Sequence, residues 1–299
     1  MTERTKLSEV RLTTADAAEA VALSAEAGWN QTVDDWALML DFGHGFGRRR
    51  HGRRRGRLLA SAVVLPYPPF AWIAMVLVTK DWQRRGIATE LLRTCIIDAQ
   101  SHGLVPGLDA TPAGSLVYRP LGFADVYSLT RMRAEAVAGV VAAAGSQGPI
   151  RAMTVADLDA VAAFDRKLFG ADRGQVLRHL FARQPGRAFL AEAHGGVSDP
   201  VTSDPVTGYV LAREGREATQ IGPLAAPDRT IACALAAAAL EGLEGPVYLD
   251  VGDRHAGFSA WLGAAGFAPQ RPYTRMIMGR AEPYDDAHRQ YAIAGPELG

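Results

Sequence analysis

The sequence has little cysteine and no long hydrophobic run. Only two of its 299 residues are cysteine, Cys95 and Cys233, and both lie in stretches of apolar helical pattern. A disulfide framework is therefore not expected, and buried reduced thiols are. The longest apolar-rich stretch, 231–240, is too short to span a bilayer. Residues 1–11 contain no signal-peptide core, so we expect a cytoplasmic protein with no membrane partner.

Net charge is also absent, since 32 basic residues balance 32 acidic ones. A general attraction to nucleic acid or to an anionic membrane is therefore not predicted. The seven histidines are scattered without ligand spacing, so no metal is expected. Hydrophobic residues make up 48% and charged residues 21% of the chain, which indicates a packed core. The length suits two ordinary domains better than one.

The strongest local charge is an arginine cluster on both sides of a His51-Gly52 turn. Its members are Arg48, Arg49, Arg50, Arg53, Arg54, Arg55 and Arg57. A polyanion-binding patch is one interpretation, and the solvated tip of a hairpin is the other. No aromatic residues interleave with the arginines and the whole chain is neutral, so we favour the hairpin and expect no nucleic-acid partner.

One stretch of the first half combines a strand, a basic turn and a helix. Residues 71–78 form an apolar run that is typical of a buried strand. The turn 79–85 ends in two arginines and is followed by Gly86, which permits a close approach of the backbone to a ligand. One apolar helical face follows, made of Ile87, Leu91, Leu92, Cys95 and Ile96. This order aims free backbone N–H groups at a phosphate, although neither a P-loop nor a dinucleotide fingerprint is present.

Two motifs carry a family resemblance. The run Gln83-Arg84-Arg85-Gly86-Ile87-Ala88 resembles the acyl-CoA pyrophosphate motif, Gln/Arg-x-x-Gly-x-Gly/Ala, of the GNAT N-acetyltransferase superfamily. Downstream, Tyr118-Arg119-Pro120-Leu121-Gly122-Phe123 is similar to the Tyr-x-x-x-Gly-Phe element that closes many such domains. The resemblance implies an α/β fold of the α+β type, in which helices flank a largely antiparallel sheet with splayed central strands. It also implies acetyl-CoA as co-substrate.

The resemblance implies a set of site residues. The acyl donor would lie between the strands 71–78 and 104–109. The backbone of Val76, Leu77 and Val78 would hold the pantetheine arm and polarise the thioester carbonyl. Tyr118 would protonate the departing thiolate, although packing is its other interpretation. The residues implied for the pyrophosphate are Gln83, Arg84, Arg85, Gly86, Ile87, Ala88 and Thr89.

In this family a free amine attacks the thioester directly, so no serine or cysteine nucleophile is needed. The acceptor would be a primary amine on a small molecule or a peptide. The general base is not identified, because the strand residues 72–75 are not acidic. Glu26, Asp34, Asp35 and His44 lie in the expected substrate-side helices, but each also suits a surface position, and a water relay would serve. The acceptor and the acyl chain length stay open.

The second half of the chain repeats features of the first. Gly122-Phe123-Ala124 is followed after five residues by Thr130-Arg131-Met132. Gly266-Phe267-Ala268 is followed, also after five residues, by Thr274-Arg275-Met276. The same six residues at the same spacing predict a duplication and therefore two GNAT-like domains in tandem. The predicted segments are a catalytic domain over 1–133, a linker over 134–149, a degenerate domain over 150–280 and a tail over 281–299.

The pyrophosphate motif is missing from the second half. Pro223 and Pro227 remove two backbone donors, and Asp228 brings negative charge while capping the next helix. Leu262 stands where the tyrosine would precede Gly266 by four residues. We expect the second domain to bind no CoA and to shape the substrate cleft or a homodimer.

Two other functional classes fit the sequence. One is an acyl-CoA-binding sensor without turnover, which a panel of amine acceptors would separate from an enzyme. The other is a polyanion binder that uses the arginine-rich hairpin on a borrowed fold, and salt-dependent binding of nucleic acid would reveal it.

Overall fold

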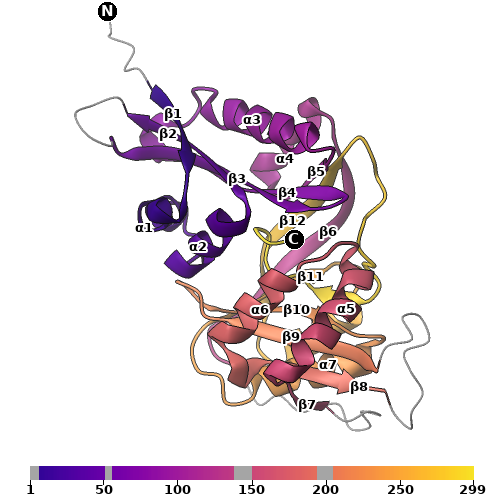
Figure 1. Cartoon of the computed structure of the whole chain (residues 1–299). Helices are drawn as coiled ribbons and strands as arrows, with labels where there is room; N and C mark the ends of the chain where they lie inside the picture. Colours follow the sequence, from indigo (N-terminus) through magenta and orange to yellow (C-terminus); the bar gives the residue numbers. More distant parts are fainter. Residues whose placement is uncertain (1–6, 51–55, 138–149, 194–204) are drawn as a thin grey trace, which may run out of the picture. The chain divides into compact units, whose positions relative to one another are not determined.

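The computed structural model describes residues 7–50, 56–137, 150–193 and 205–299. They form two compact units, Met1–Leu108 and Asp109–Gly299, which we call the N-terminal and the C-terminal unit. Each unit is built around a mainly antiparallel sheet with helices on both faces (Figure 1). The predicted fold class is therefore confirmed.

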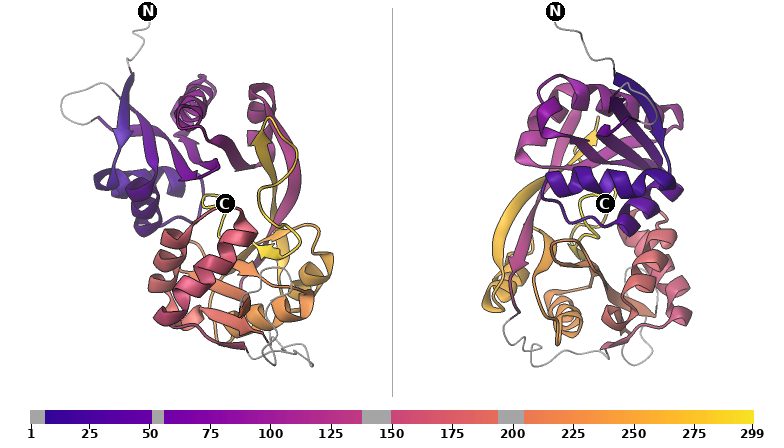
Figure 2. Two further views of the ribbon diagram at one scale, coloured as in Figure 1. Left: turned by 45° about the vertical axis from the view of Figure 1, so that its right-hand side comes forward. Right: turned by 90° about the vertical axis from the view of Figure 1, so that its left-hand side faces the viewer.

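The N-terminal unit arranges its strands in the order β1-β2-β3-β4-β5. Neighbours are antiparallel except β4 and β5, which are parallel. The strands are β1 (Leu7–Leu12), β2 (His44–Arg50), β3 (Leu58–Tyr67), β4 (Phe70–Val78) and β5 (Val105–Ala110), the last of which crosses the boundary between the units. The helices are α1 (Ala17–Glu26), α2 (Val33–Phe42) and α3 (Ile87–Ser101), with short 3-10 turns η1 (Thr14–Asp16) and η2 (Lys80–Trp82). Figure 2 shows α1 and α2 on one face of this sheet and α3 on the other.

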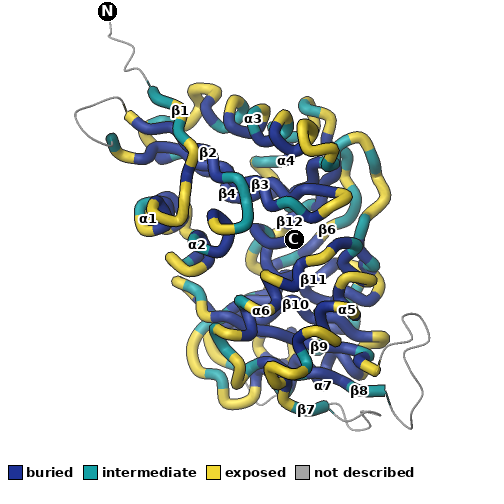
Figure 3. The backbone as a smooth tube through the Cα atoms, viewed as in Figure 1, coloured by how far each residue is buried: buried dark blue, intermediate teal, exposed yellow. Residues whose placement is uncertain are grey.

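Sequence pattern accounts for these elements. Strands β3 and β4 are almost entirely apolar, which fits the helices that cover both of their faces, and Figure 3 shows most of both strands as buried. Helix α3 buries Ile87, Leu91 and Cys95 on one face. The first helical segment begins with a capping box in which Thr13 and Asp16 bond each other's backbone.

The C-terminal unit arranges its strands in the order β12-β6-β11-β13-β10-β9-β8-β7. The strands are β6 (Phe123–Ala134), β7 (Ile150–Ala152), β8 (Phe189–Glu192), β9 (Val206–Arg213), β10 (Thr219–Ala225), β11 (Val247–Gly252), β12 (Ala268–Met278) and β13 (Gln290–Ala292). The helical elements are α4 (Pro112–Tyr118), η3 (Arg119–Leu121), η4 (Val155–Asp157), α5 (Leu158–Phe169), α6 (Gly174–Arg183), η5 (Pro185–Arg187), α7 (Arg229–Leu240) and α8 (Ala256–Ala264). Helices α5 and α6 cover one face of β9, and α7 covers the other (Figure 1).

The element order repeats, as the duplicated tripeptides predicted. The series β1, α1, α2, β2, β3, β4, α3, β5, α4, β6 returns as β7, α5, α6, β8, β9, β10, α7, β11, α8, β12. The capping box returns as well, because Thr154 and Asp157 bond each other as Thr13 and Asp16 do. Both cysteines are free and buried. Among the described residues, no helix is both long and apolar enough to cross a membrane.

The repeated Thr-Arg-Met tripeptides lie on neighbouring strands, β6 and β12, and the arginine of each pairs with an aspartate from the other half of the repeat. Strand β6 pairs with β12 on one side and with β11 on the other. Arg131 of β6 forms two hydrogen bonds of 2.8 Å with Asp250 of β11. Arg275 of β12 bonds Asp109 of β5 at 3.0 and 2.9 Å. Both arginines are buried, so each half of the repeat supplies the cation that neutralises a buried aspartate of the other half.

Because strands of the two halves pair with each other, the compact units have other boundaries than the predicted domains. The predicted first domain ends at residue 133, whereas the first compact unit ends at Leu108 because β6 pairs with strands of the second half. Most of the predicted linker, 138–149, lies outside the described residues. The predicted tail, 281–299, contains β13, which is part of the sheet.

Candidate functional site

Strand β4 carries a bulge opposite β3. The register pairs Val63 with Ala74 and Ser61 with Leu77, so two residues of β4, Met75 and Val76, face one residue of β3. Met75 has a φ of 53°, and the buried Ser61 hydroxyl donates to its carbonyl at 2.9 Å. A bulge re-aims the backbone of the strand, and this one does so at Val76, one of the residues implied to hold the acyl donor. The sequence analysis missed it, although Ser61 was a signal because it is a lone polar residue in an apolar strand.

Beyond this bulge, β4 and β5 separate. The parallel ladder contains the three pairs Phe70–Val105, Ala71–Pro106 and Trp72–Gly107. Beyond Trp72 and Gly107 no further residues of β4 and β5 pair with each other in the described chain, although β4 stays paired with β3. We call this divergence the β4–β5 fork. The splayed strands expected from the family resemblance are therefore present.

The predicted phosphate-binding turn ends at the start of α3. Gly86 is the N-cap of the helix with a φ of 83°, and Arg84 also has a positive φ, 59°. Within the described chain no side chain caps this helix. Its first backbone N–H groups therefore have no helical acceptor, and the helix dipole adds partial positive charge at the same point. A Cβ placed on Gly86 would meet no atom within 4 Å, so the glycine serves the backbone conformation rather than packing.

The side chains of the turn are exposed and held at its edges. Gln83 donates to the carbonyl of Val78 at 3.0 Å. Arg85 donates to the carbonyl of Asp81 at 2.9 Å, and its guanidinium lies 4.7 Å from the ring centroid of Trp82. The predicted set runs continuously from the end of β4 into α3, with Val76, Val78, Ala88 and Thr89 half-buried, Leu77 and Ile87 buried, and Gln83, Arg84, Arg85 and Gly86 exposed.

Glu26, a candidate general base, holds the start of this turn. Its carboxylate accepts from the backbone N–H of Lys80 at 2.7 Å and from the hydroxyl of Thr79 at 2.9 and 2.7 Å. The Lys80 N–H and, next, the Thr79 hydroxyl keep the pKa of Glu26 below its usual value. These hydrogen bonds join α1 to the end of β4. Because they lower the pKa of the Glu26 carboxylate, it is a poor proton acceptor.

The other candidate bases divide by burial. Asp35 is fully buried and caps α2, where it accepts from the backbone N–H of Thr32 at 2.7 Å. His44 lies 2.6 Å from Asp98, measured from Nδ1 to Oδ2. Asp34 is exposed in the first turn of α2. Asp35 and His44 are therefore engaged in contacts within the protein. Of these three candidate bases, only Asp34 is exposed.

Tyr118 is the last residue of α4 and belongs to the C-terminal unit. Its half-buried ring lies 6.1 Å from the ring of Phe123, centroid to centroid. A Cβ on Gly114 would approach Cε2 of Tyr118 to 2.8 Å and its hydroxyl to 3.2 Å. The ring therefore lies over Gly114, four residues earlier on the same helix. Because Gly114 has no side chain, it leaves room for the ring and its hydroxyl.

The second half carries an equivalent bulge with different chemistry. Strand β10 pairs Ile221 with Ala212 and Leu224 with Val210, so Gly222 and Pro223 face one residue of β9. Pro223 therefore takes the position that Val76 has in β4. Proline has no backbone N–H, so this bulge lacks the donor that the family resemblance assigns to Val76. The sequence analysis had counted Pro223 among the lost pyrophosphate donors and missed this correspondence.

The fork of the second half is filled by the chain itself. The β10–β11 ladder ends after Thr219–Val247 and Gln220–Tyr248. Strand β13 then lies between them, because Ala292 pairs both with Leu224 of β10 and with Val251 of β11. We call this place the β10–β11 fork, and the yellow segment in Figure 2 enters it.

Polar contacts anchor the segment on both sides of β13. Asp285 accepts from Arg275 at 3.0 Å, and Glu297 pairs with the buried Arg213. Arg173 donates to the carbonyl of Gly299 at 2.8 Å. Gly222 makes the approach possible, since a Cβ at this residue would lie 2.1 Å from the carbonyl oxygen of Ile293.

The helix after the second fork, α7, is capped at its N-terminus by a side chain. Asp228 is the N-cap of α7, and its carboxylate accepts from the backbone N–H of Ile231 at 3.0 Å. The predicted cap is therefore confirmed. An anion approaching this helix would meet a carboxylate, whereas at α3 it would meet free N–H groups and two arginines.

Comparison with known families agrees with this geometry. A model of the acetyltransferase (GNAT) family matches residues 16–123, and a second acetyltransferase (GNAT) domain model matches residues 161–292. The chain is a tandem GNAT protein. Its family places it among the acyltransferases, which use acetyl-CoA as co-substrate and act on amine acceptors.

Two curated relatives match nearly the whole GNAT chain. One is an uncharacterised N-acetyltransferase, YitH, of Bacillus subtilis (strain 168), which is 21% identical over 93% of both chains. The other is a holothin acyltransferase of Pseudoalteromonas sp. (strain SANK 73390), which is 27% identical over 90% of this chain and 91% of its own.

Solved structures show the same tandem fold. A protein from Pyrococcus horikoshii, provisionally classed as an acetyltransferase, superposes with a TM-score of 0.75 at 18% identity and covers 100% of this chain and 98% of its own. A tandem GNAT protein from the clavulanic acid biosynthesis pathway gives a TM-score of 0.61 at 18% identity, over 93% of this chain and 99% of its own. Because identity is low, these likenesses concern the fold alone.

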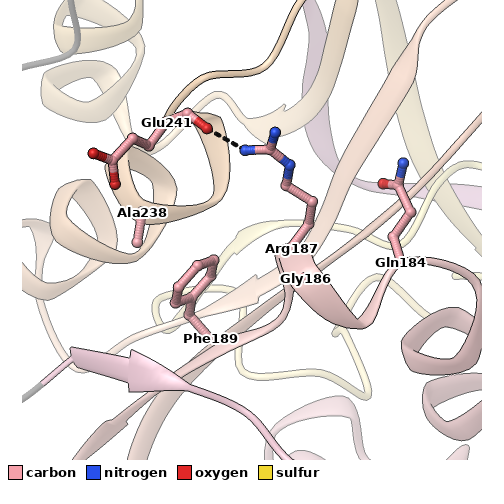
Figure 4. A pocket seen from close by; sticks show the side chains of 6 residues that line it. All are labelled: Gln184, Gly186, Arg187, Phe189, Ala238 and Glu241. Atoms are coloured by element: carbon pink, nitrogen blue, oxygen red, sulfur yellow. Dashed lines mark hydrogen bonds between the residues drawn. The ribbon is translucent and has the colours of Figure 1, made fainter.

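A pocket of about 520 Å³ lies elsewhere in the C-terminal unit of this GNAT protein. Figure 4 shows the residues that line it, which are Gln184, Gly186, Arg187, Phe189, Ala238 and Glu241. Arg187 donates to the backbone carbonyls of Ala239 and Glu241 at the C-terminal end of α7. Its charge is therefore used to cap a helix, and the lining contains no acid–base pair for catalysis.

The arginine-rich hairpin is partly neutralised at its base. Arg49 pairs with Asp16 at 2.8 Å and with Glu19 at 2.6 Å, and Arg48 pairs with Glu9 at 3.3 Å. The predicted tip, 51–55, lies outside the described residues. In the described part of the hairpin, Arg48 and Arg49 therefore form ion pairs within the protein.

Proposed function

We propose that this chain is an N-acyltransferase that moves an acetyl group from acetyl-CoA to a primary amine and that its first half holds the donor. The observation that carries the proposal is the difference between the two forks. The β4–β5 fork has a bulge at Val76 and an uncapped helix behind it, whereas the β10–β11 fork has Pro223, a capped helix and β13.

The turn before α3 suits the pyrophosphate of the donor. The N–H groups of residues 86–89 and the dipole of α3 attract an anion. Arg84 and Arg85 add two full charges, and both are exposed to solvent, where a phosphate can reach them. Gln83 keeps the turn joined to the end of β4 through the carbonyl of Val78.

The bulge in β4 suits the reacting end of the donor. Acetyl-CoA supplies an activated thioester carbonyl that a free amine attacks directly. The backbone N–H of Val76, re-aimed by the bulge at Met75, would stabilise the negative charge that develops on the carbonyl oxygen. Tyr118 would give its proton to the sulfur as the carbon–sulfur bond breaks. The attacking amine would lose its proton through a water relay, since Glu26, Asp35 and His44 are engaged in structural contacts.

The acceptor is proposed as a small-molecule or peptide amine. The full-length relative that acts on holothin supports a small-molecule acceptor, because the alignment covers both halves of each chain. The second half would then contribute shape rather than chemistry.

Calorimetric titration of the full chain with acetyl-CoA tests the proposal. One site per chain is expected, because the second fork offers neither the bulge N–H nor the free helix N-terminus. Two equivalent sites would refute the assignment to one half. Turnover is followed as free CoA thiol released in the presence of a panel of primary amines. Release that needs no amine would argue for a hydrolase, and binding without any release would argue for a sensor.

A further inference from the structure

Three side chains that the sequence separates come together at the far end of α3. His44 is the first residue of β2, Asp98 lies in the last turn of α3, and His102 follows that helix as its C-cap. One ligand atom from each lies within 4.8 Å of the other two. Asp98 and His102 are four residues apart and so share a helix face, and β2 brings His44 to it.

The histidine rings are arranged as metal ligands commonly are. Nδ1 of His102 lies 2.8 Å from the backbone carbonyl of Asp98 and 3.3 Å from the Ser101 hydroxyl. A ligating histidine usually donates its other ring N–H to such a carbonyl, which fixes the tautomer and leaves Nε2 as the ligand. The rings of His44 and His102 are 5.2 Å apart and tilted by 53°, a separation that two imidazoles on one ion can adopt.

Asp98 supplies the anionic ligand. Its side chain is only 8% exposed, and Oδ2 lies 2.6 Å from Nδ1 of His44. A tetrahedral ion between them, about 2.0 Å from each atom, requires a separation of roughly 3.3 Å. His44 is partly exposed and can move by that small amount, and Arg11, which reaches Oδ1 of Asp98 at 3.4 Å, is positioned to stay on the other oxygen.

Among the described residues, the surroundings of the cluster provide no fourth ligand. Cys95 lies one turn before Asp98, but burial raises the pKa of its thiol well above the usual value, so it stays protonated. Arg11 is the only other charged side chain recorded in contact with Asp98 among the described residues, and its guanidinium lies over the ring of Phe46. The cluster therefore offers two imidazoles and one carboxylate.

We propose that His44, Asp98 and His102 form a binding site for a divalent transition-metal ion, with Zn²⁺ as the ion that this donor set suits best. Three protein ligands leave a fourth position for water. The site lies at the opposite end of α3 from Gly86, roughly 18 to 24 Å along the helix axis. Its ion would tie the start of β2 to the end of α3, and the inference is independent of the proposed acyl transfer.

The test uses the tag-free full chain after treatment with a chelator and dialysis. Zn²⁺ is titrated calorimetrically, and Co²⁺ is titrated while the visible ligand-field absorption is recorded. One ion per chain is expected, together with a rise in melting temperature on adding Zn²⁺, because the ion binds only the folded chain. His102→Ala should weaken Zn²⁺ binding by more than about 100-fold, since losing a direct ligand exceeds the loss seen for supporting residues.

Matched variants keep the result decisive. His102 is exposed, so His102→Ala should melt like the original chain in the presence of chelator. His288→Ala removes an equally exposed histidine outside the cluster and should bind Zn²⁺ unchanged. Failure of the original chain to bind Zn²⁺ or Co²⁺ would reduce the cluster to a hydrogen-bonded His–Asp pair. Equal affinities of His102→Ala and the original chain would also overturn the proposal.

Discussion

The two forks of this protein have the same bulge and opposite contents. In the first, Met75 and Val76 form the bulge, and the strands part toward a helix whose N-terminus is uncapped. In the second, Gly222 and Pro223 form it, and β13 pairs with both strands. The comparison teaches that two halves of a repeated fold can share a bulge while differing in what lies beyond it. In the second fork, β13 forms peptide hydrogen bonds with both strands.

The largest expected effect comes from making the first fork resemble the second. Gly86→Asp places a carboxylate at the N-terminus of α3, as Asp228 does at α7. Repulsion of the pyrophosphate should weaken acetyl-CoA binding by more than about 100-fold, because like charges in contact cost several kcal/mol. Calorimetry measures the affinity, and circular dichroism checks the fold.

Gly103→Asp is the matched control for this change. Gly103 follows the other end of α3 with a φ of 72°, and a Cβ there would meet no atom within 4 Å, as at Gly86. It should bind acetyl-CoA as the original chain does. Equal losses in both variants would mean that the left-handed backbone, and not charge at the pyrophosphate, causes the effect.

The next effect concerns Tyr118, which has no counterpart in the second half because Leu262 stands there. Tyr118→Phe keeps the ring over Gly114 and removes the hydroxyl. Turnover should fall by about 100-fold with little change in acetyl-CoA affinity, which is the signature of a lost general acid. Steady-state kinetics on an acceptor found by screening measures it, with Tyr284→Phe, also half-buried in this unit, as control. Full turnover in Tyr118→Phe would leave Tyr118 a packing residue.

The smallest effect tests the second fork. Gly222→Ala brings a Cβ to within 2.1 Å of the Ile293 carbonyl oxygen and should lower the free energy of unfolding by about 3 kcal/mol, as measured by urea denaturation. Gly245→Ala, which also has a positive φ but open space, should cost only about 1 kcal/mol. Gly222→Ala should still bind one acetyl-CoA, because Pro223 and Asp228 remain. A second site appearing in this variant would show that β13 alone excludes the donor.

Much of this architecture could be predicted from local patterns. The apolar runs, the basic turn before Gly86 and the repeated Thr-Arg-Met tripeptides led to the strands, the candidate donor site and the duplication. The Asp228 cap could also be predicted, because capping depends on a residue and its next few neighbours.

The features that could not be predicted depend on contacts between segments that are far apart in the sequence. Nothing near residues 290–292 indicates that they enter a sheet between β10 and β11, because that pairing is decided by the partner strands. The bulge at Met75 is set by the register with β3, and the cluster of His44 with Asp98 and His102 is set by how β2 packs on α3. Ligand spacing along the sequence detects only sites built from one segment.

The exchanged arginine–aspartate pairs make each half of this protein depend on the other. Strand β6 comes from the first half, but both of its neighbours in the sheet, β11 and β12, come from the second. A chain shortened to its first half would leave both edges of β6 open and Arg131 without Asp250. The second half therefore completes the sheet around β6, whatever it contributes to the reaction.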